Sequence, residues 1–228
     1  MPPDGRRREA LLVFARTPVA GEVKTRLSPA ISLDDAARLY EAFLRDALHA
    51  YASLEADLFL FLSGPTERLP RGIVPANVEV APQRGRSLGK RMRNAFASTF
   101  AKGYERVVLI GSDHPTLPSA FVGEAFRRLE EPFSLVLGPA EDGGYYLVGM
   151  NELYPELFEG VRYSRSTVWA ETLERCAAVE AALTILPAWF DVDTPESLAR
   201  LATELSDDTG ISAPCTRAVL AELKDRPG

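Results

Sequence analysis

An apolar run near the start of the chain ends at residue 15, and three cations follow within eleven residues: Arg16, Lys24 and Arg26. Pro18 and Gly21 favour an open loop here rather than an immediate helix. The backbone amides of such a loop, together with Lys24 and Arg26, could hold a phosphate group. The spacing is not that of a Walker P-loop. The segment therefore predicts either a phosphate cradle or a solvated basic loop.

Two aspartates follow other apolar runs. Asp113 comes directly after the buried run of "LIGSDHP", and Asp193 lies in "DVDTPESL". A hard divalent cation takes one or two carboxylates together with the phosphate oxygens of a substrate. The same residues also have structural explanations. Asp113 precedes Pro115 and could cap a turn, and either Asp193 or Thr194 could be the N-cap of the helix that follows, with Pro195 in its first turn.

The stretch "GPAEDGGYYL" places two acids and two glycines in a row, Glu141 to Gly144. Paired glycines allow the backbone to approach a ligand or to adopt positive φ. A plain hairpin turn explains Asp-Gly-Gly equally well. Its place after an apolar run, like that of Asp113, makes it a candidate for the same site.

Short apolar runs alternate with amphipathic patterns, and this alternation indicates how the polar segments are positioned. The runs predict strands at residues 10–15, 57–64, 78–83, 106–113, 133–138, 145–150 and 182–187. The patterns predict helices at residues 33–51, 87–103, 118–130, 164–179, 193–205 and 214–224. The order implies βαβ units and a mainly parallel sheet that is covered on both faces.

In sheets of this kind the ligand crevice lies outside the carboxyl ends of the strands. Four polar segments follow predicted strands: the basic loop, the segment around Asp113, the Glu141–Gly144 turn, and Asp191 with Asp193. We therefore expect these four segments to meet at one edge of the sheet.

The bulk composition excludes several classes of function. The 228 residues carry a formal net charge of −6, which argues against broad binding of nucleic acid or anionic membranes. No apolar run approaches the ~20 residues that span a bilayer. The two cysteines fit no metal or disulfide pattern. We expect one domain at residues 10–225 after a disordered lead at 1–9, in a cytoplasmic protein.

The two histidines and the crevice serines suggest no nucleophilic site. His49 lies near a helix end, and His114 could touch a ligand because it follows Asp113. Ser112 and Ser164 have no histidine at a nucleophile-elbow spacing, which disfavours a Ser-His-Asp hydrolase.

Four ordered motifs carry a family resemblance: "FARTPVAGEVKTRL", "LIGSDHPTLP", "GPAEDGGYYLVGM" and "FDVDTPESL". Together they resemble the nucleotide-diphospho-sugar transferase-like family DUF2064, whose members include glycosyltransferases of arsenosugar-type and selenium-associated neighbourhoods. The resemblance runs from about Ala10 to Leu223. It implies a GT-A-like, Rossmann-type three-layer α/β/α fold that binds a nucleotide through its N-terminal half. The motifs are also similar to those of small nucleotidyltransferases.

The resemblance also implies roles for individual residues. Lys24, Asp113 and Asp142 would be catalytic, and Asp113 and Asp193 would bind Mg²⁺ or Mn²⁺. Glu141, Asp142, Gly143 and Gly144 would face the acceptor or sugar. The nucleotide would contact Ala15, Arg16, Pro18, Gly21, Lys24, Arg26, Ser87, Leu88, Gly89 and Arg91. The usual D-x-D of glycosyltransferases appears here as Ser112-Asp113-His114, which leaves one acid in the motif.

Three functions are compatible with these residues. The first is glycosyl transfer from a nucleotide-diphospho-sugar to a small acceptor, with Asp142 as general base and Glu141 as second choice. The second is nucleotidyl transfer from a nucleoside triphosphate to a phosphorylated small molecule, which needs no such base. The third is a nucleotide-binding module without turnover. The family resemblance favours glycosyl transfer.

Overall fold

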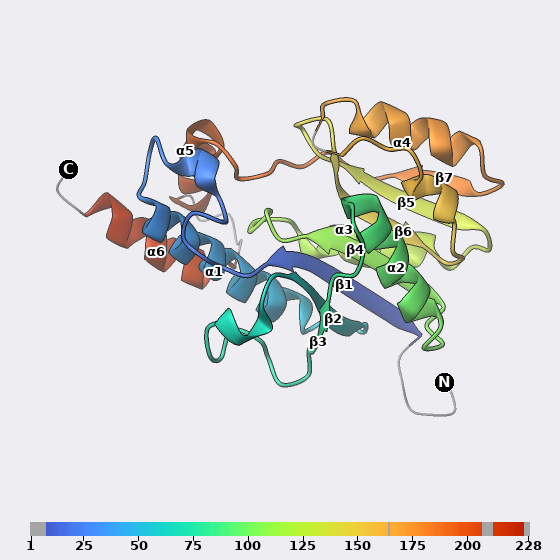
Figure 1. Cartoon of the computed structure of the whole chain (residues 1–228), viewed down its shortest axis with the longest axis horizontal. Coiled ribbons are helices and arrows are strands. Elements are labelled where there is room, and N and C mark those ends of the chain that lie inside the picture. The colour runs from blue at the N-terminus through green and yellow to red at the C-terminus, as the bar shows by residue number, and fades with distance from the viewer. Residues whose placement is uncertain (1–7, 164, 207–211, 226–228) are drawn as a thin grey trace.

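The computed structural model describes residues 8–163, 165–206 and 212–225 (Figure 1). Its centre is a seven-stranded sheet in the order β3-β2-β1-β4-β6-β5-β7. The strands are β1 (Glu9–Arg16), β2 (Asp57–Ser63), β3 (Glu79–Pro82), β4 (Arg106–Gly111), β5 (Ser134–Pro139), β6 (Tyr145–Met150) and β7 (Ala182–Ile185).

Six α-helices and three short 3₁₀ helices connect the described strands and follow them. The α-helices are α1 (Leu33–Tyr51), α2 (Leu88–Phe100), α3 (Ser119–Arg128), α4 (Val168–Ala177), α5 (Pro195–Ser206) and α6 (Pro214–Lys224). The 3₁₀ helices are η1 (Thr25–Leu27), η2 (Thr66–Arg68) and η3 (Pro155–Phe158). None of the described helices combines the length and the apolar character that a bilayer crossing requires.

The strand directions bring the polar segments to one edge of the sheet. β1 pairs in parallel with β2 and β4, and β5 pairs in parallel with β7. β6 is antiparallel to both β4 and β5, so β5 runs in the same direction as β4. The carboxyl ends of β1, β4, β5 and β7 therefore point the same way. The basic loop, the Ser112–His114 segment, the 140–144 turn and the 187–194 segment all follow these ends.

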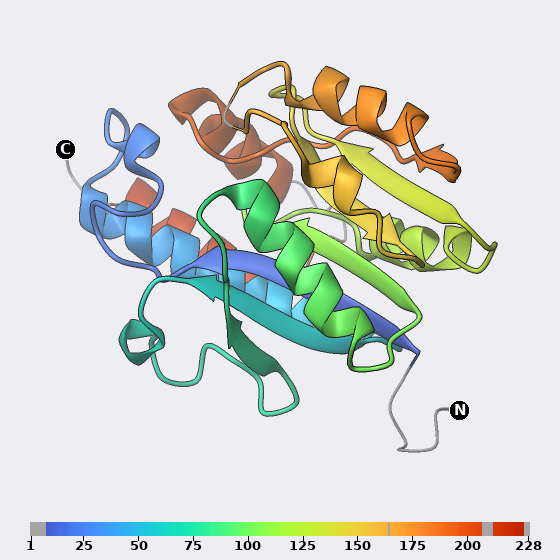
Figure 2. The same cartoon turned by 45° about the vertical axis from the view of Figure 1, so that its right-hand side comes forward.

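Helices cover both faces of the sheet, because alternate strand residues point to opposite sides. In β1, Leu11 and Val13 pack with apolar residues of α1 and α3, whereas Leu12 and Phe14 pack with α2 and η3. Figure 2 shows α2 lying across one face while α1 lies behind the other. The predicted three-layer α/β/α architecture with a mainly parallel, mixed sheet is confirmed.

A third apolar cluster extends the structure beyond the sheet. It joins Val23 and Leu27 near η1 to Leu39 and Phe43 of α1 and to Leu201 of α5. α6 lies alongside α1 (Figure 1). This cluster fixes the basic loop against α1 and α5, so the loop is anchored to a core of its own.

The described boundaries differ from the sequence prediction by a few residues at the starts and ends of elements. α5 begins at Pro195, and of the two candidate caps it is Thr194 that accepts a hydrogen bond from Ser197 N–H, at 3.3 Å. α4 begins at Val168, and Ser164, the predicted start, lies outside the described residues. Residues 1–7 of the expected lead also lie outside them, and β1 begins at residue 9.

A buried carboxylate attaches α6 to α1. Asp46 of α1 is 4% exposed. Its two oxygens accept hydrogen bonds from the backbone N–H groups of Cys215 and Thr216, at 3.0 and 2.8 Å. Asp46 therefore caps the first turn of α6 from a neighbouring helix, and satisfies two donors that α6 cannot satisfy itself.

Replacement of Asp46 tests this cap. We expect Asp46→Ala to lower the free energy of unfolding by about 2 kcal/mol, because two N–H groups lose their acceptor. Asp46→Asn keeps one carbonyl acceptor and should lose less. Urea denaturation measures both. An alanine variant as stable as the parent would show that α6 does not depend on this cap.

Candidate functional site

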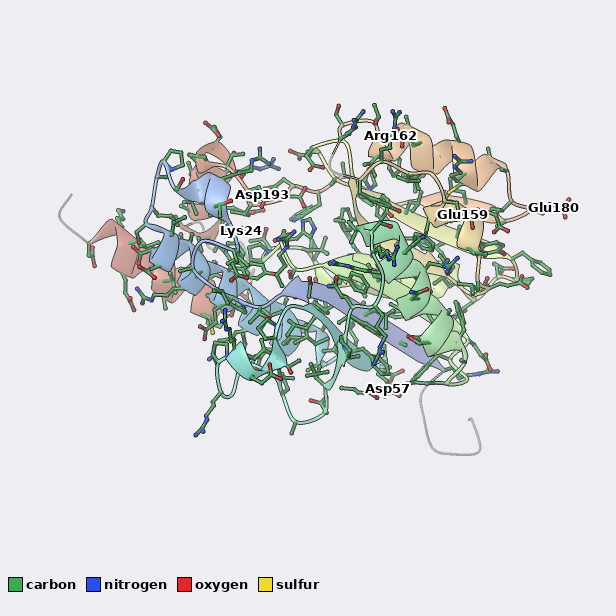
Figure 3. All side chains as sticks on the ribbon, viewed as in Figure 1. Lys24, Asp57, Glu159, Arg162, Glu180 and Asp193 are labelled. Carbon is green, nitrogen blue, oxygen red and sulfur yellow. The ribbon has the colours of Figure 1, made fainter. Side chains whose placement is uncertain are left out.

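The candidate site lies where three distant chain segments meet, at the carboxyl edge of the sheet. Lys24 comes from the basic loop, Asp113 follows β4, and Asp193 precedes α5. The backbone N–H of Val192 donates to the carbonyl of Asp113 at 3.0 Å, which holds the second and third segments side by side. Figure 3 labels Lys24 and Asp193, which lie next to each other between α1 and α5.

Lys24 is the centre of the site. Its Nζ lies 2.5 Å from Oδ1 of Asp113 and 2.7 Å from Oδ1 of Asp193. The lysine side chain is 3% exposed, whereas the two carboxylates are 40% and 37% exposed. The rings of Tyr40 and Phe43 lie 5.7 and 5.8 Å from the ammonium. A buried cation thus joins two carboxylates that still reach the crevice.

The backbone directs the lysine inward. Lys24 has φ 49° and ψ 30°, in the left-handed region that few residues other than glycine adopt. Val23 and Leu27, on either side, are buried in the cluster with α1 and α5. Because apolar neighbours hold this turn, the side chain between them points into the protein rather than into solvent.

The charges of the three residues stabilise one another. Burial by itself would lower the pKa of Lys24, but Asp113 and Asp193 outweigh it and raise that pKa above its ordinary value. Burial likewise acts to raise the pKa of Asp113, and the lysine overcomes it and holds that pKa below its usual range. Lys24 and Asp113 are therefore both charged at neutral pH.

Asp193 is free to take part because it does not cap α5. The hydroxyl of Ser197 accepts hydrogen bonds from the backbone N–H groups of Asp193 and Thr194, both at 2.9 Å. Thr194 caps the helix with its own side chain. The structural explanation that the sequence left open for Asp193 thus belongs to its neighbours, and the Asp193 carboxylate faces Lys24.

Asp191 belongs to the site, although the sequence analysis did not select it as a site residue. Burial, reinforced by the nearby carboxylates of Asp142, Asp113 and Asp193, raises the pKa of Asp191 to about 8. Its Oδ1 lies 3.2 Å from Nε2 of His114. The available signal was its position, two residues before Asp193 in a segment that follows a strand.

His114 is buried against this segment. Its Nδ1 lies 3.1 Å from the carbonyl oxygen of Phe190, which can only accept, so Nδ1 donates. Burial lowers the pKa of His114 below its usual value, which favours the neutral ring. In that ring Nε2 is an acceptor, and a protonated Asp191 carboxyl can donate to it. The pair therefore carries little net charge below the pKa of Asp191.

Tyr40 connects the basic loop to the β4 segment and was also missed. Its hydroxyl accepts a hydrogen bond from the backbone N–H of Arg16 at 2.9 Å and lies 2.7 Å from Oγ of Ser112. Burial raises the pKa of Tyr40 to about 12, so it stays neutral. Only its position on the inner face of α1 could have indicated this role, and that position is equally typical of a core residue.

The other predicted loop residues stay at the surface. Arg16 and Arg26 are exposed, and no ion pair joins either of them to another residue in the described ranges. Gly21 has φ 79°, which keeps the loop open as its glycine predicted. The loop therefore presents one buried, paired cation and two solvent-facing ones.

The predicted nucleotide segment at the start of α2 reaches the ends of β1 and β2. The side-chain amide of Gln83 donates to the carbonyls of Ala15 and Phe61, both at 3.0 Å. Arg91 donates to the Gly85 carbonyl and to Oγ of Ser63, both at 3.1 Å. These bonds place the segment beside the end of β1, where Ala15 and Arg16 lie.

Within this segment the predicted residues have different surroundings. Ser87 caps α2 by accepting from the Lys90 N–H at 3.4 Å, and Leu88 is exposed. Gly89 is buried so closely that an added Cβ would lie 2.7 Å from the Phe158 carbonyl and from the Tyr163 ring. Beside them lies a cleft of about 400 Å³, lined by Ser87, Gly89, Lys90, Arg93, Phe158, Glu159, Gly160 and Val161.

The Glu141–Gly144 segment is a tight turn between β5 and β6. The Gly144 N–H donates to Oδ1 of Asp142 at 2.9 Å, and Gly143 has φ 93°. Glu141 makes two bonds to Arg200 of α5, at 2.7 and 3.2 Å. The hairpin explanation therefore holds for the backbone, while Asp142 remains exposed at the crevice.

An acidic cleft of about 310 Å³ joins this turn to Asp193. Five carboxylates and two arginines are among its lining residues: Arg26, Glu141, Asp142, Phe190, Asp191, Asp193, Thr194, Glu196, Ser197 and Arg200. Arg200 lies over the Phe190 ring at 3.8 Å and is paired with Glu141. Within the described residues, no group of three or more His, Cys, Asp or Glu side chains could hold a metal ion by itself.

The raised pKa of Asp191 predicts a pH-dependent stability. Its folded-state pKa of about 8 lies above the ordinary unfolded value of about 4, so the folded protein holds a proton that the unfolded chain releases. The stabilisation that this proton gives the folded state is fully present below pH 4 and is lost as the pH rises through 8. We expect the stability of Asp191→Asn relative to the parent to increase between pH 5 and 8.5, measured by urea denaturation. Asp34→Asn, at an exposed position, is the control, and a difference that does not change with pH would contradict the assignment.

Comparison with known proteins places the chain in a family. It is similar to a "putative nucleotide-diphospho-sugar transferase" from Desulfovibrio desulfuricans G20, with 35% identity over 96% of both chains and a TM-score of 0.88. No curated protein matches the chain.

Two more distant structures share the fold alone. CMP:2-keto-3-deoxy-manno-octonic acid synthetase complexed with CTP has 11% identity over 87% of this chain and 98% of its own, with a TM-score of 0.56. The manganese complex of Rv0371c from Mycobacterium tuberculosis H37Rv has 18% identity over 86% and 98%, with a TM-score of 0.50. The profile described as "Uncharacterized protein conserved in bacteria (DUF2064)" matches residues 36–165, more than half of the chain. The chain therefore belongs to the DUF2064 family, with a nucleotide-diphospho-sugar transferase-like fold.

Proposed function

We propose that this protein is a metal-dependent glycosyltransferase that moves a sugar from a nucleotide-diphospho-sugar to an uncharged hydroxyl acceptor. The observation that carries the proposal is the acidic cleft beside the Lys24–Asp113–Asp193 cluster. The cluster provides a place for the diphosphate, and the cleft provides a place for an acceptor that brings no phosphate of its own.

The residues present fit a divalent cation. Asp113 and Asp193 offer hard oxygen ligands, and the Lys24 ammonium already lies between them as a cation would. Two carboxylates are enough when substrate phosphates complete the coordination. When bound there, Mg²⁺ or Mn²⁺ supplies a Lewis acid that neutralises charge on the leaving diphosphate.

Lys24 has two partners in turn. In the ligand-free protein it neutralises Asp113 and Asp193, which would otherwise repel each other. A bound diphosphate would offer the ammonium a phosphate oxygen, and Asp113 and Asp193 would then be the residues that hold the metal. Arg16 and Arg26, exposed on the same loop, add positive charge where the leaving group becomes more negative.

The acceptor hydroxyl must lose a proton as the new bond forms. Asp142 is the proposed base, because it is exposed at the cleft and its Oδ1 is held by the Gly144 N–H. Glu141, the second choice from sequence, is held by Arg200 and is less available. Asp191 is protonated up to a pKa of about 8 and is a poorer acceptor at neutral pH.

The charge of the cleft distinguishes the two candidate reactions. A nucleotidyltransferase of this kind would admit a phosphorylated nucleophile, which the exposed carboxylates of Asp142 and Glu196 in the cleft would repel. A neutral hydroxyl acceptor meets no such barrier. One observation favours nucleotidyl transfer as the second candidate: Arg84, Arg86 and Lys90 are exposed near the start of α2, where a triphosphate would offer more charge to bind.

A ligand panel tests the proposal. We expect a nucleotide-diphospho-sugar to raise the melting temperature more than any nucleoside triphosphate, and only with Mg²⁺ or Mn²⁺ present. A ligand at 100 times its Kd stabilises a fold by about 2.7 kcal/mol, which a thermal shift detects readily. A response to one triphosphate alone would favour nucleotidyl transfer. Binding without turnover over a broad acceptor screen would favour a nucleotide-binding module.

Asp113→Asn tests the metal assignment. The variant keeps the size of the side chain and removes its charge, and Lys24 retains Asp193 as a partner. We expect the apparent affinity for the donor in the presence of metal, measured by thermal shift, to fall at least tenfold. The far-UV circular dichroism spectrum should stay unchanged. Asp57→Asn is the matched control, because Asp57 lies in β2 and its carboxylate accepts a hydrogen bond from the Tyr104 hydroxyl. Unchanged metal dependence in Asp113→Asn would remove Asp113 from the metal site.

A further inference from the structure

The Ser112-Asp113-His114 motif has a histidine where a D-x-D motif has its second acid. The side chain of His114 is 3% exposed, so it does not face the crevice as a metal ligand would. Two contacts account for its ring nitrogens: Nδ1 with the Phe190 carbonyl at 3.1 Å, and Nε2 with Asp191 Oδ1 at 3.2 Å. Both ring nitrogens therefore contact other groups of the protein and neither faces the crevice.

Both contacts go to the segment that carries Asp193. They lie beside the hydrogen bond from the Val192 N–H to the Asp113 carbonyl, at 3.0 Å. Residues 113 and 114 thus hold residues 190, 191 and 192 in one alignment. Asp193 is the next residue along, and its carboxylate reaches Lys24 at 2.7 Å.

The surroundings of His114 fit its ring closely. A Cβ on Gly111 would lie 3.3 Å from Nε2, so the glycine at the end of β4 leaves room for the imidazole. On another side the Tyr146 ring meets it edge to face, with centroids 5.7 Å apart. These contacts leave the ring little freedom to rotate, and a fixed ring can fix the segment to which it bonds.

We propose that His114 is a positioning residue that aligns residues 190–193, so that Asp193 supplies the second carboxylate of the metal site. The motif lacks a second acid, and the hydrogen bonds of His114 bring Asp193 into that role instead. This inference rests on the proposed function, because it assigns the site its metal. It also explains how a motif with one acid can belong to a site with two.

Mn²⁺ binding provides the test, measured by electron paramagnetic resonance with inorganic pyrophosphate present in place of the donor diphosphate. We expect His114→Ala to weaken Mn²⁺ binding at least tenfold. His114→Asn should recover most of this loss, because its amide can donate to the Phe190 carbonyl as Nδ1 does. His49→Ala, which changes the only other histidine in the sequence, should bind Mn²⁺ like the parent.

A double-mutant cycle separates positioning from general damage. If His114 acts through Asp193, His114→Ala should add little further loss of Mn²⁺ affinity in an Asp193→Asn background. Pyrophosphate binding without metal should persist in His114→Ala, because the basic loop is unchanged. Additive losses, or an equal loss of metal-free pyrophosphate binding, would overturn the inference.

Two further outcomes separate this inference from the proposed function. Tight Mn²⁺ binding by both the parent and a folded His114→Ala variant would overturn the positioning role and leave the metal-dependent transferase intact. Absence of Mn²⁺ binding in the parent, even with pyrophosphate, would overturn the metal site and the inference with it. If His114→Ala fails to fold, His114→Leu, which keeps an apolar bulk at the buried position and makes neither hydrogen bond, replaces it in the same cycle.

Discussion

The arrangement of this site depends on one buried ammonium group. Lys24 joins Asp113 and Asp193, from segments that are far apart in the chain, within 2.7 Å of a single nitrogen. Removing a charge from water is costly unless close partners replace the lost hydration, and here two carboxylates do so. Their partial exposure lowers that cost and also keeps them available to a ligand. The same contacts hold the loop in place and keep two carboxylates available to a cation and one ammonium available to an anion.

The antiparallel strand β6 contributes to the site indirectly. It lies between β4 and β5 and reverses direction, which restores β5 to the direction of β4. The turn that carries Asp142 therefore emerges at the same edge as Asp113. β7 pairs in parallel with β5, so the segment that follows it also reaches this edge and carries Asp191 and Asp193. One reversed strand therefore brings the acidic segments to the same edge of the sheet as the basic loop that follows β1.

The acidic side shows how environment separates chemically identical groups. Asp113 is paired with Lys24 and its pKa is held low, whereas the pKa of Asp191, two residues before Asp193, is raised to about 8 by burial and by its acidic neighbours. Glu141 is neutralised by Arg200, while its neighbour Asp142 is exposed. Carboxyl groups at one edge of the sheet therefore differ in charge and in availability, and this difference is what allows a site to assign them different roles.

The sequence by itself determined the fold class, the order of strands and helices, and the edge at which the polar segments meet. Apolar runs and 3.6-residue patterns are local signals, and the direction rule for parallel strands converts them into a shared edge. It also selected Lys24, because three cations share one loop after the first strand, and Asp113 and Asp193, because both carboxylates follow predicted strands. Only the tertiary structure decided that these three form one ion-paired cluster, and that Thr194 rather than Asp193 caps α5. It also revealed Tyr40 as part of the site, and the contact between His114 and Asp191, which the sequence placed only at the same edge. Their roles arise from contacts between residues up to 77 positions apart, as between His114 and Asp191. The sequence pattern of one segment does not indicate which distant segment packs against it.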